Sequence, residues 1–479
     1  MSEQEKAPHD PGVSRRGFGG LAVGAGAVAV GGLLPGTAEA STRAETDFSP
    51  LNTRPARRPN ILFILADDLG WADLSCYGAT GRPTPHLDEL ARQGLRFTDA
   101  YSGSAVCSPT RFSLYTGRYP GRLSGGNAEP ILDGRKDGIP PEHPTLASLL
   151  GGAGYETAMY GKWHCGFLPD FSPIRSGWQE FFGNFAGGVD YFSHVSVDSG
   201  KPDLYEAEVP VEKIGYYTDL LTGRAVGFIE RPHRRPWLLN LNYTTPHWPW
   251  EGPGDKAESD RLNARVAAGE APINVFTHRD GGSLKVFAEM VTSLDRGVGS
   301  VLEALRRSGQ ERDTLVVFAS DNGGERFSYL WPFNGGKANL YEGGIRVPQI
   351  VRWPGVIGRR QVTGVPMVTY DWFPTLLELA GAAPDPAYPT DGVSFASYLL
   401  NGGNVPRRDL FWRMRGQGAL RRGDYKYHSV LNGGTAVESL FDLATDQREM
   451  SNLARREPAV FADLKAAWQK VDAGLVPYS

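Results

Sequence analysis

The sequence predicts an α/β fold in which a large, mixed and mostly parallel sheet lies between helices, followed by a small antiparallel sheet with a helix. Two apolar runs, Asn60–Ala66 and Thr314–Ser320, have the composition of parallel strands that are buried on both faces. Strands alternate with helical patterns from residue 60 to about residue 380. The alternating polarity further on predicts short antiparallel strands at Leu410–Met414, Ala419–Val430 and Ser439–Leu443, followed by an amphipathic helix at Ala459–Val471.

Residues 1–40 are predicted to be a twin-arginine signal peptide. Ser14-Arg15-Arg16-Gly17-Phe18 carries the arginine pair, and the apolar segment Leu21–Leu34 follows it. That segment is short and rich in glycine and alanine, so we expect no stable membrane span. Ala38-Glu39-Ala40 has small residues at the spacing that signal peptidase prefers. We therefore expect export by the twin-arginine translocase to the periplasm or the extracellular space.

Composition limits the classes of partner. The 479 residues are 41% hydrophobic and 22% charged, as in an ordinary globular protein, and the formal net charge is −4. No basic field is available for nucleic acid. Residues 41–59 are predicted to be a linker, residues 60–405 a large domain and residues 406–479 a C-terminal subdomain. Segments 168–215 and 250–285 contain few periodic apolar positions and are expected to form walls of a substrate cleft.

Cys107-Ser108-Pro109-Thr110-Arg111 predicts a cysteine at the start of a helix. Pro109 suits the first helical turn, Ser108 can cap the helix and Gly117 can end it. The free N–H groups of that turn and Arg111 favour a bound anion at this position. A thiol placed there is expected to be activated.

Oxygen-bearing side chains follow both apolar strands. Asp67 and Asp68 come after the first, and Asp321 and Asn322 come after the second. Because ligands of open α/β sheets bind beyond the carboxyl ends of the strands, these two pairs can meet. Either pair alone is typical of an ordinary turn or helix cap. Together they predict a site for a hard divalent cation, for which we favour Ca²⁺ over Mg²⁺.

Several further segments resemble one family. C-x-P-x-R at Cys107–Arg111, followed by L-x-T-G-R, resembles the signature of the type I, formylglycine-dependent sulfatases, which are arylsulfatase-like members of the alkaline phosphatase superfamily. The remaining islands occur in the family's order and are Gly161-Lys162-Trp163-His164, Thr245-Pro246-His247-Trp248-Pro249, Asn334-Gly335-Gly336-Lys337 and Tyr341-Glu-Gly-Gly-Ile-Arg-Val-Pro348. The resemblance implies an alkaline-phosphatase-like sulfatase fold, with residues 60–405 as the catalytic domain.

The resemblance also implies the chemistry. Cys107 would be converted to Cα-formylglycine by a formylglycine-generating or sulfatase-maturating enzyme, and its hydrate would attack the sulfur of a sulfate ester. The products would be inorganic sulfate and an alcohol or phenol. The implied metal ligands are Asp67, Asp68, Cys107, Asp321 and Asn322, and the implied catalytic residues are Cys107, Arg111, Lys162, His164, His247 and Lys337.

In the implied roles, Lys162 and Lys337 hold the sulfuryl oxygens, and Arg111 steadies the diol and the carboxylates. His247 protonates the leaving group, with Lys337 close enough to assist. His164 deprotonates the second hydroxyl of the diol. The substrate class stays open between small sulfate esters and sulfated glycans. Trp163, Trp248 and Trp250 either stack on it or belong to the core.

Two other functions are compatible with parts of this pattern. Related folds with the same nucleophile motif hydrolyse phosphonate or phosphate esters, which makes such a hydrolase the main alternative. A non-catalytic binder of sulfated glycans is less favoured, because a binder does not need both histidines and a convertible cysteine.

Overall fold

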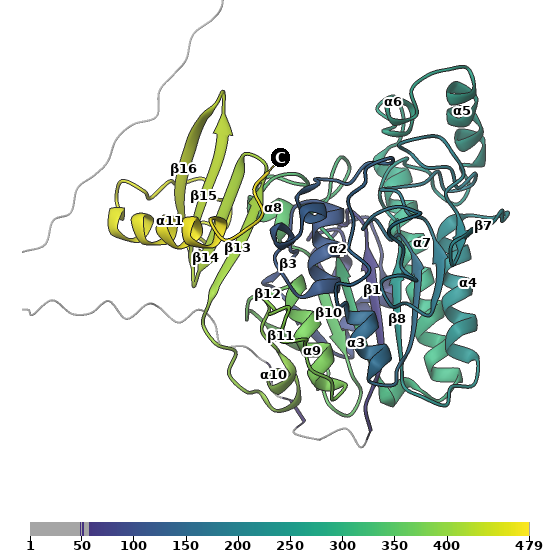
Figure 1. Cartoon of the computed structure of the whole chain (residues 1–479), viewed down its shortest axis with the longest axis horizontal. Coiled ribbons are helices and arrows are strands. Elements are labelled where there is room, and N and C mark those ends of the chain that lie inside the picture. Colours follow the sequence, from purple (N-terminus) through teal and green to yellow (C-terminus); the bar gives the residue numbers. More distant parts are fainter. Residues whose placement is uncertain (1–47, 49, 52–56, 479) are drawn as a thin grey trace, which may run out of the picture. The chain divides into compact units, whose positions relative to one another are not determined.

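The computed structural model describes residues 48, 50–51 and 57–478 of the chain. The predicted signal peptide and most of the predicted linker lie outside the described residues. The main element of the described part is a sheet with strands β1 (Asn60–Ala66), β2 (Leu95–Phe97), β4 (Glu156–Gly161), β5 (Glu180–Gly183), β6 (Tyr205–Glu206), β7 (Val209–Pro210), β8 (Trp237–Asn242), β9 (Thr314–Ser320), β10 (Gln349–Arg352) and β11 (Gln361–Thr363). Their order across the sheet is β11-β2-β10-β9-β1-β8-β4-β5-β6-β7. Figure 1 labels β11, β10, β1, β8 and β7 in this order from left to right.

The centre of this sheet is parallel. β1 pairs in parallel with β8 on one side and β9 on the other, and β4 pairs in parallel with β8 and β5. β10 is antiparallel to β9 and β2, and β6 runs antiparallel to β5 and β7. The predicted mixed, mostly parallel sheet is confirmed. Because parallel neighbours end at the same edge, the segments that follow β1, β4, β8 and β9 meet there.

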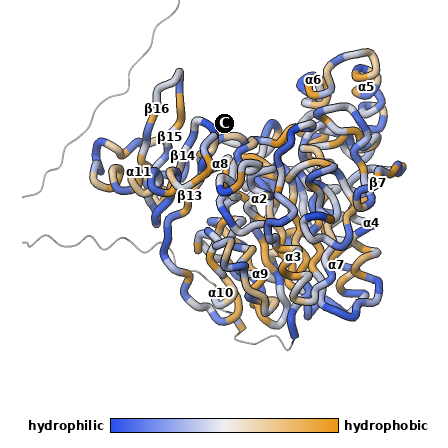
Figure 2. Tube along the Cα trace, viewed as in Figure 1, coloured by the Kyte–Doolittle hydropathy of each residue, from blue (hydrophilic) through white to orange (hydrophobic). Residues whose placement is uncertain are grey.

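Helices cover both faces of the sheet. They are α1 (Pro85–Arg92), α2 (Cys107–Thr116), α3 (Leu146–Gly152), α4 (Tyr217–Glu230), α7 (Leu284–Arg307), α9 (Trp372–Leu379) and α10 (Ala396–Asn401). Three further helices, α5 (Lys256–Ala267), α6 (Pro272–Phe276) and α8 (Glu342–Ile345), pack in smaller separate clusters. Ile61, Phe63 and Leu65 of β1 pack in one hydrophobic cluster with α2, α3 and α9, whereas the residues between them pack in another with α1, α4 and α7. Figure 2 shows the hydrophobic segments gathered in the interior of this domain.

The chain ends in a separate four-stranded antiparallel sheet with one helix. Its strands, in order, are β13 (Asp409–Met414), β14 (Gln417–Arg422), β15 (Tyr425–Asn432) and β16 (Thr435–Asp442), and α11 (Pro458–Asp472) packs on them. The expectation of a single strand at 419–430 is wrong, because the chain turns at Gly423, whose φ is 60°. A short two-stranded sheet of β3 (Ala100–Tyr101) and β12 (Met367–Val368) completes the strands of the described residues.

The segment 250–285, which is expected to form a wall of the substrate cleft, contains α5 and α6. Among the described helices, none has both the length and the hydropathy that crossing a bilayer requires.

Buried ion pairs join the C-terminal sheet to the large domain. Arg421 of β14 places Nη2 2.9 Å from Asp99 Oδ2. Lys426 of β15 places Nζ 2.9 Å from Glu342 Oε1 and 2.8 Å from Glu449 Oε1, and its side chain and those of both glutamates are fully buried. Buried charges of this kind are tolerated only when each has a partner.

We predict that Lys426→Met lowers the free energy of unfolding by about 3–5 kcal/mol, because Glu342 and Glu449 lose their shared buried cation. Chemical denaturation of the mature protein measures this. Lys465→Met is the matched control, since Lys465 pairs with Glu438 at a partly exposed position and is expected to cost about 1 kcal/mol or less. Equal losses in the two variants would contradict the prediction.

Candidate active site

Two pairs of oxygen-bearing side chains follow neighbouring parallel strands. Asp67 and Asp68 come directly after β1, and Asp321 and Asn322 come directly after β9. The last residues of the two strands are paired in register, and the backbone N–H of Asp68 donates to Asp321 Oδ1 at 3.3 Å. None of the four is more than 2% exposed. The structure therefore brings the four predicted oxygen donors together at one edge of the sheet.

Cys107 is the first residue of α2 and is 2% exposed. The helix ends before Gly117, which has a φ of 68°, as the sequence predicts. Ser108 does not cap it; its hydroxyl accepts a hydrogen bond from the N–H of Ile131 at 3.0 Å. The cysteine is nevertheless at the N-terminal end of the helix, where unpaired backbone N–H groups favour an anion.

The unmodified thiol of Cys107 is not activated. Burial raises its pKa to about 11, although Lys162 and Lys337 act in the opposite direction. Contrary to the expectation of an activated thiol, burial outweighs the nearby protein cations at this position.

Three cations neutralise the three carboxylates. Lys162, directly after β4, places Nζ 2.6 Å from Asp67 Oδ2. Arg111, one turn into α2, donates to Asp321 Oδ2 from Nη2 at 2.8 Å and from Nε at 3.1 Å. The third Arg111 nitrogen, Nη1, donates to the carbonyl of Lys162 at 2.9 Å, which links two of these cations through the backbone.

Lys337 is the third cation and lies in the loop between β9 and α8. Its Nζ is 2.8 Å from Asp68 Oδ2 and 3.5 Å from Glu325 Oε1. Burial alone would lower the pKa of Lys337, but these carboxylates hold it well above its ordinary value. Burial likewise opposes the charged form of Asp68, yet Lys337 and His247 lower the pKa of that carboxyl to about 2. Both groups therefore stay charged.

The two histidines present opposite ring nitrogens to backbone carbonyls. His164 Nε2 is 2.8 Å from the carbonyl of Ile131, so Nε2 carries the proton, and the buried Nδ1 has no hydrogen-bond partner among the described residues. His247 Nδ1 is 2.6 Å from the carbonyl of Trp248, and Nε2 is 3.7 Å from Asp68 Oδ2. Burial, together with nearby lysines, holds the pKa of both imidazoles well below the ordinary value.

The donors fit a hard divalent cation. Asp67, Cys107 and Asp321 each offer a ligand atom within 4.8 Å of the others, and so do Asp67, Asp68 and His247. The buried Asp67 Oδ1 and Asn322 Oδ1 have no hydrogen-bond partner among the described residues. Burial and repulsion from Asp321 raise the pKa of Asp67 well above its ordinary value. A bound cation would ligate these unpaired oxygens and reduce the repulsion between the carboxylates.

The sequence model of the family described as Sulfatase matches residues 59–382, which is more than half of the chain. The chain belongs to the sulfatase family. The match begins just before β1 and includes every predicted site residue. It ends after α9, before the C-terminal sheet.

Curated relatives agree with this assignment. The sulfatase is 33% identical to arylsulfatase A of Homo sapiens over 428 residues, which cover 85% of this chain and 82% of the relative. It is 32% identical to N-acetylgalactosamine-6-sulfatase of Rattus norvegicus over 395 residues, which cover 77% of this chain and 71% of the relative. The sulfatase is therefore an enzyme that hydrolyses sulfate esters.

Solved structures support the fold. The crystal structure of Ps i-CgsB in complex with k-i-k-neocarrahexaose has a TM-score of 0.74 at 29% identity, covering 86% of this chain and 92% of that one. The PsFucS1 sulfatase from Pseudoalteromonas sp. has a TM-score of 0.71 at 26% identity, covering 87% and 90%. The predicted alkaline-phosphatase-like sulfatase fold is confirmed.

Residues that the sequence did not single out support this site. Gln417 of β14 donates from Nε2 to the carbonyl of Ala338 at 2.9 Å and accepts from the N–H of Leu340 at 3.1 Å. The C-terminal sheet thus holds the loop that carries Lys337. Glu325 shares Lys337 with Asp68. The one sequence signal that could have identified Glu325 is its position three residues after Asn322.

Two glycines of the 168–215 segment lie against the histidines. A Cβ atom on Gly187 would be 3.0 Å from Cε1 of His164, and one on Gly188 would be 3.0 Å from Nδ1 of His247. Real Cβ atoms rarely approach that closely, so either ring would have to move. The chain contains 60 glycines, and nothing in the sequence distinguishes these two.

We predict that Gly188→Ala lowers kcat/KM for a sulfate ester roughly tenfold, because His247 is displaced by a few tenths of an ångström. Steady-state kinetics and thermal melting measure the effect. Gly227→Ala is the matched control, since a Cβ there meets nothing within 4 Å and the change occurs at an exposed position near the C-terminal end of α4. The control should keep full activity and gain about 0.5–1 kcal/mol of stability. Full activity in Gly188→Ala would show that the close contact does not position the imidazole.

Proposed function

We propose that this sulfatase acts through a formylglycine hydrate derived from Cys107, with Ca²⁺ bound beside it. The observation that carries the proposal is the position of Cys107. It lies at a helix N-terminus and within 4.8 Å of ligand atoms of Asp67 and Asp321. A thiol that accepted a sulfuryl group would have no second hydroxyl group with which to expel it, whereas an aldehyde hydrate at the same place has two hydroxyl groups. Conversion would require a formylglycine-generating or sulfatase-maturating enzyme.

Asp67, Asp68, Asp321, Asn322 and the modified side chain at position 107 would hold the cation, and Mg²⁺ is the alternative to Ca²⁺. When bound, such an ion lowers the pKa of a hydroxyl group and stabilises negative charge. The four strand-end residues offer only oxygen ligands, the type that Ca²⁺ and Mg²⁺ prefer.

The charge balance of the site suits an anionic substrate. Arg111, Lys162 and Lys337 face four carboxylates, those of Asp67, Asp68, Asp321 and Glu325, so a divalent cation leaves the ionised site with one excess positive charge. Lys162, Lys337 and the first turn of α2 are positioned to bind sulfuryl oxygens. Arg111 fixes Asp321 through two hydrogen bonds and thereby orients the metal ligands.

The histidines would move protons on either side of the substrate. His247 would give a proton to the leaving oxygen from Nε2 as the imidazolium, because the neutral ring keeps its one proton on Nδ1, where it donates to a carbonyl. The low pKa of the ring would make that imidazolium a strong acid. His164 is held in the tautomer that leaves Nδ1 free to accept a proton from the hydrate. Regeneration of the aldehyde would then expel inorganic sulfate.

Two substrate classes are proposed, small sulfate esters and sulfated glycans. Relatives are named for arylsulfatase and N-acetylgalactosamine-6-sulfatase activities, and a solved neighbour contains a neocarrahexaose. Trp163 and Trp250 are buried, with Trp163 stacked on Tyr115, so both belong to the core. Trp248 is partly buried and its ring lies 4.3 Å from that of His247, which makes it the tryptophan that suits a substrate ring.

The proposal includes export. The twin-arginine pattern of residues 14–18 supports transport by the twin-arginine translocase to the periplasm or the extracellular space. This route carries folded proteins, so conversion of Cys107 and folding would both be complete before transport.

We predict that protein with unconverted Cys107, and the Cys107→Ala variant, turns over nitrophenyl sulfate at no more than about a thousandth of the rate of converted protein. Mass spectrometry of the peptide that contains Cys107 measures the conversion, and activity should rise in proportion to it. Nitrophenyl phosphate and phenylphosphonate should react far more slowly. Rapid turnover by protein shown to retain the thiol would refute the formylglycine mechanism, and faster turnover of the phosphorus esters would favour the alternative hydrolase.

We predict that removal of Ca²⁺ with a chelator abolishes activity and lowers Tm, and that Ca²⁺ restores both. At a concentration 100 times its Kd, the ion should stabilise the fold by about 2.7 kcal/mol. Asn322→Leu should lose the Ca²⁺-dependent rise in Tm. Asp260→Ala, at an exposed acidic position, should keep it. If neither Ca²⁺ nor Mg²⁺ changes the Tm of the converted wild-type protein, these residues are not a cation site.

A further inference from the structure

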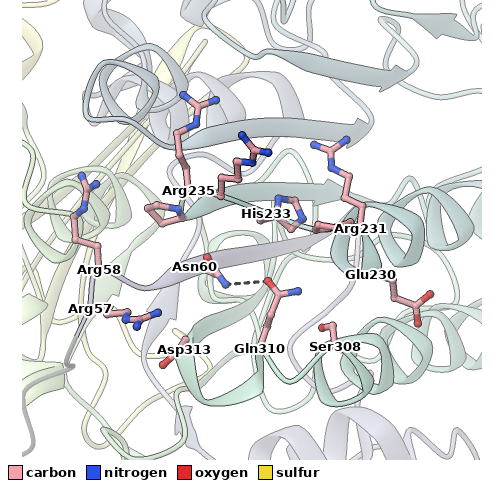
Figure 3. A pocket seen from close by; sticks show the side chains of 13 residues that line it. Arg57, Arg58, Asn60, Glu230, Arg231, His233, Arg235, Ser308, Gln310 and Asp313 are labelled. Atoms are coloured by element: carbon pink, nitrogen blue, oxygen red, sulfur yellow. Dashed lines mark hydrogen bonds between the residues drawn. The ribbon is translucent and has the colours of Figure 1, made fainter.

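A pocket lies at the edge of the large sheet opposite the active site. Its volume is about 580 Å³, and it is lined by the segments that lead into β1 and β8 and by the region after α7 (Figure 3). The active site follows the carboxyl ends of these strands, whereas this pocket precedes their amino ends. A strand of seven residues separates the two sites by about 20 Å.

The same three-residue sequence precedes both strands. Arg57-Arg58-Pro59 leads into β1, and Arg234-Arg235-Pro236 leads into β8. Because Ile61 pairs with Leu238, both prolines are two positions before the same rung of the parallel ladder. The register of the sheet therefore brings two arginine pairs to one place. All four arginines are exposed and line the pocket.

These arginines have no carboxylate partners among the described residues. Arg58 donates to the carbonyl of Ala153 at 2.5 Å, and no ion pair forms within the described chain for the other three. The remaining charges near the pocket are largely neutralised: Arg231 pairs with Glu180 at 2.6 Å, and Glu230 pairs with Arg307 at 2.5 Å. Asp313 is the one lining carboxylate of the described pocket without such a partner. The four guanidinium groups are therefore opposed by one unpaired carboxylate, that of Asp313.

The floor of the pocket is polar and held in place. Asn60 Nδ2 donates to Gln310 Oε1 at 3.2 Å, and Trp237 Nε1 donates to the same oxygen at 2.8 Å. Figure 3 shows Asn60 and Gln310 in the middle of the pocket, with labelled arginines around them. A concave site with several guanidinium groups that lack carboxylate partners matches ligands that carry more than one sulfate group, because each guanidinium can bind two oxygens of one sulfate.

We propose that this pocket is a second, non-catalytic binding site for the sulfate groups of a sulfated glycan. The inference rests on the proposed use of sulfated glycans as substrates and deepens it. Arg57, Arg58, Arg234 and Arg235 bind sulfate groups of a polymer, and the polar floor accepts sugar hydroxyl groups. The concavity favours a glycan over a membrane, whose anionic groups lie in a plane.

The test is calorimetric titration of the mature Cys107→Ala protein, without the predicted signal peptide, with a heparin hexasaccharide. In this background, Arg234→Gln/Arg235→Gln should weaken binding at least tenfold and reduce the slope of log K against log salt by about 2. The matched control is Arg455→Gln/Arg456→Gln, an exposed arginine pair far along the sequence and outside the pocket, which should change neither quantity. Lys337→Ala, which alters the active site, should leave the pocket's contribution intact. Thermal melting confirms that each variant is folded.

Several results would overturn the proposal. These are unchanged hexasaccharide binding in the pocket variant, an equal loss in the control pair, or binding of inorganic sulfate as tight as that of the hexasaccharide. Arginine-dependent binding of phosphatidylglycerol vesicles without an effect on hexasaccharide binding would assign the pocket to a membrane instead. Turnover of nitrophenyl sulfate by the converted pocket variant should equal that of wild type. Failure of the proposed function would appear in that turnover assay, which is independent of the titration.

Discussion

The parallel register of β1 with β8 and β9 is the constraint on which the rest of the structure depends. It aligns the last residues of β1 with those of β9, so that Asp67 and Asp321 leave the sheet together. It also aligns β1 with β8, whose following turn carries His247. A slip of one residue would exchange the two faces of a strand and separate the carboxylates. The same register sets the amino ends of the strands, where the two arginine pairs meet.

Burial of the strand-end charges ties the assembly of the site to the folding of the whole chain. Each carboxylate is neutralised by a cation from a different element: Lys162 follows β4, Arg111 belongs to α2, and Lys337 lies before α8. An unpaired charge at this depth would be strongly destabilising, so these elements must all be in place before the site is stable. In the C-terminal sheet, the buried Arg421 and Lys426 are likewise paired with carboxylates of other elements. Gln417 of the same sheet is hydrogen-bonded to the loop that carries Lys337.

The sequence predicted the features that depend on local patterns. β1 and β9 were identified because a strand buried on both faces is apolar throughout, and α2 was identified from Pro109 and Gly117. Alternating polarity alone could not reveal the turn at Gly423 within the predicted strand 419–430. The high pKa of Cys107 depends on how deeply the helix start is buried, which no local pattern encodes. Gly187 and Gly188 matter through contacts with residues distant in sequence, so they could not be distinguished from other glycines.

The two edges of the sheet handle charge in different ways, and this difference fits a polyanionic substrate. The cations of the candidate active site are buried and paired with carboxylates, so their field is confined to the interior of the site. The arginines of the opposite edge are exposed and unpaired with any carboxylate of the described chain, so their field extends into solvent. Because the whole chain carries a formal net charge of −4, it does not attract a polyanion by its overall charge. Attraction of a polyanion therefore has to come from a local cluster of positive charge. The parallel register that aligns the carboxyl ends of the strands also gathers the four arginines at their amino ends.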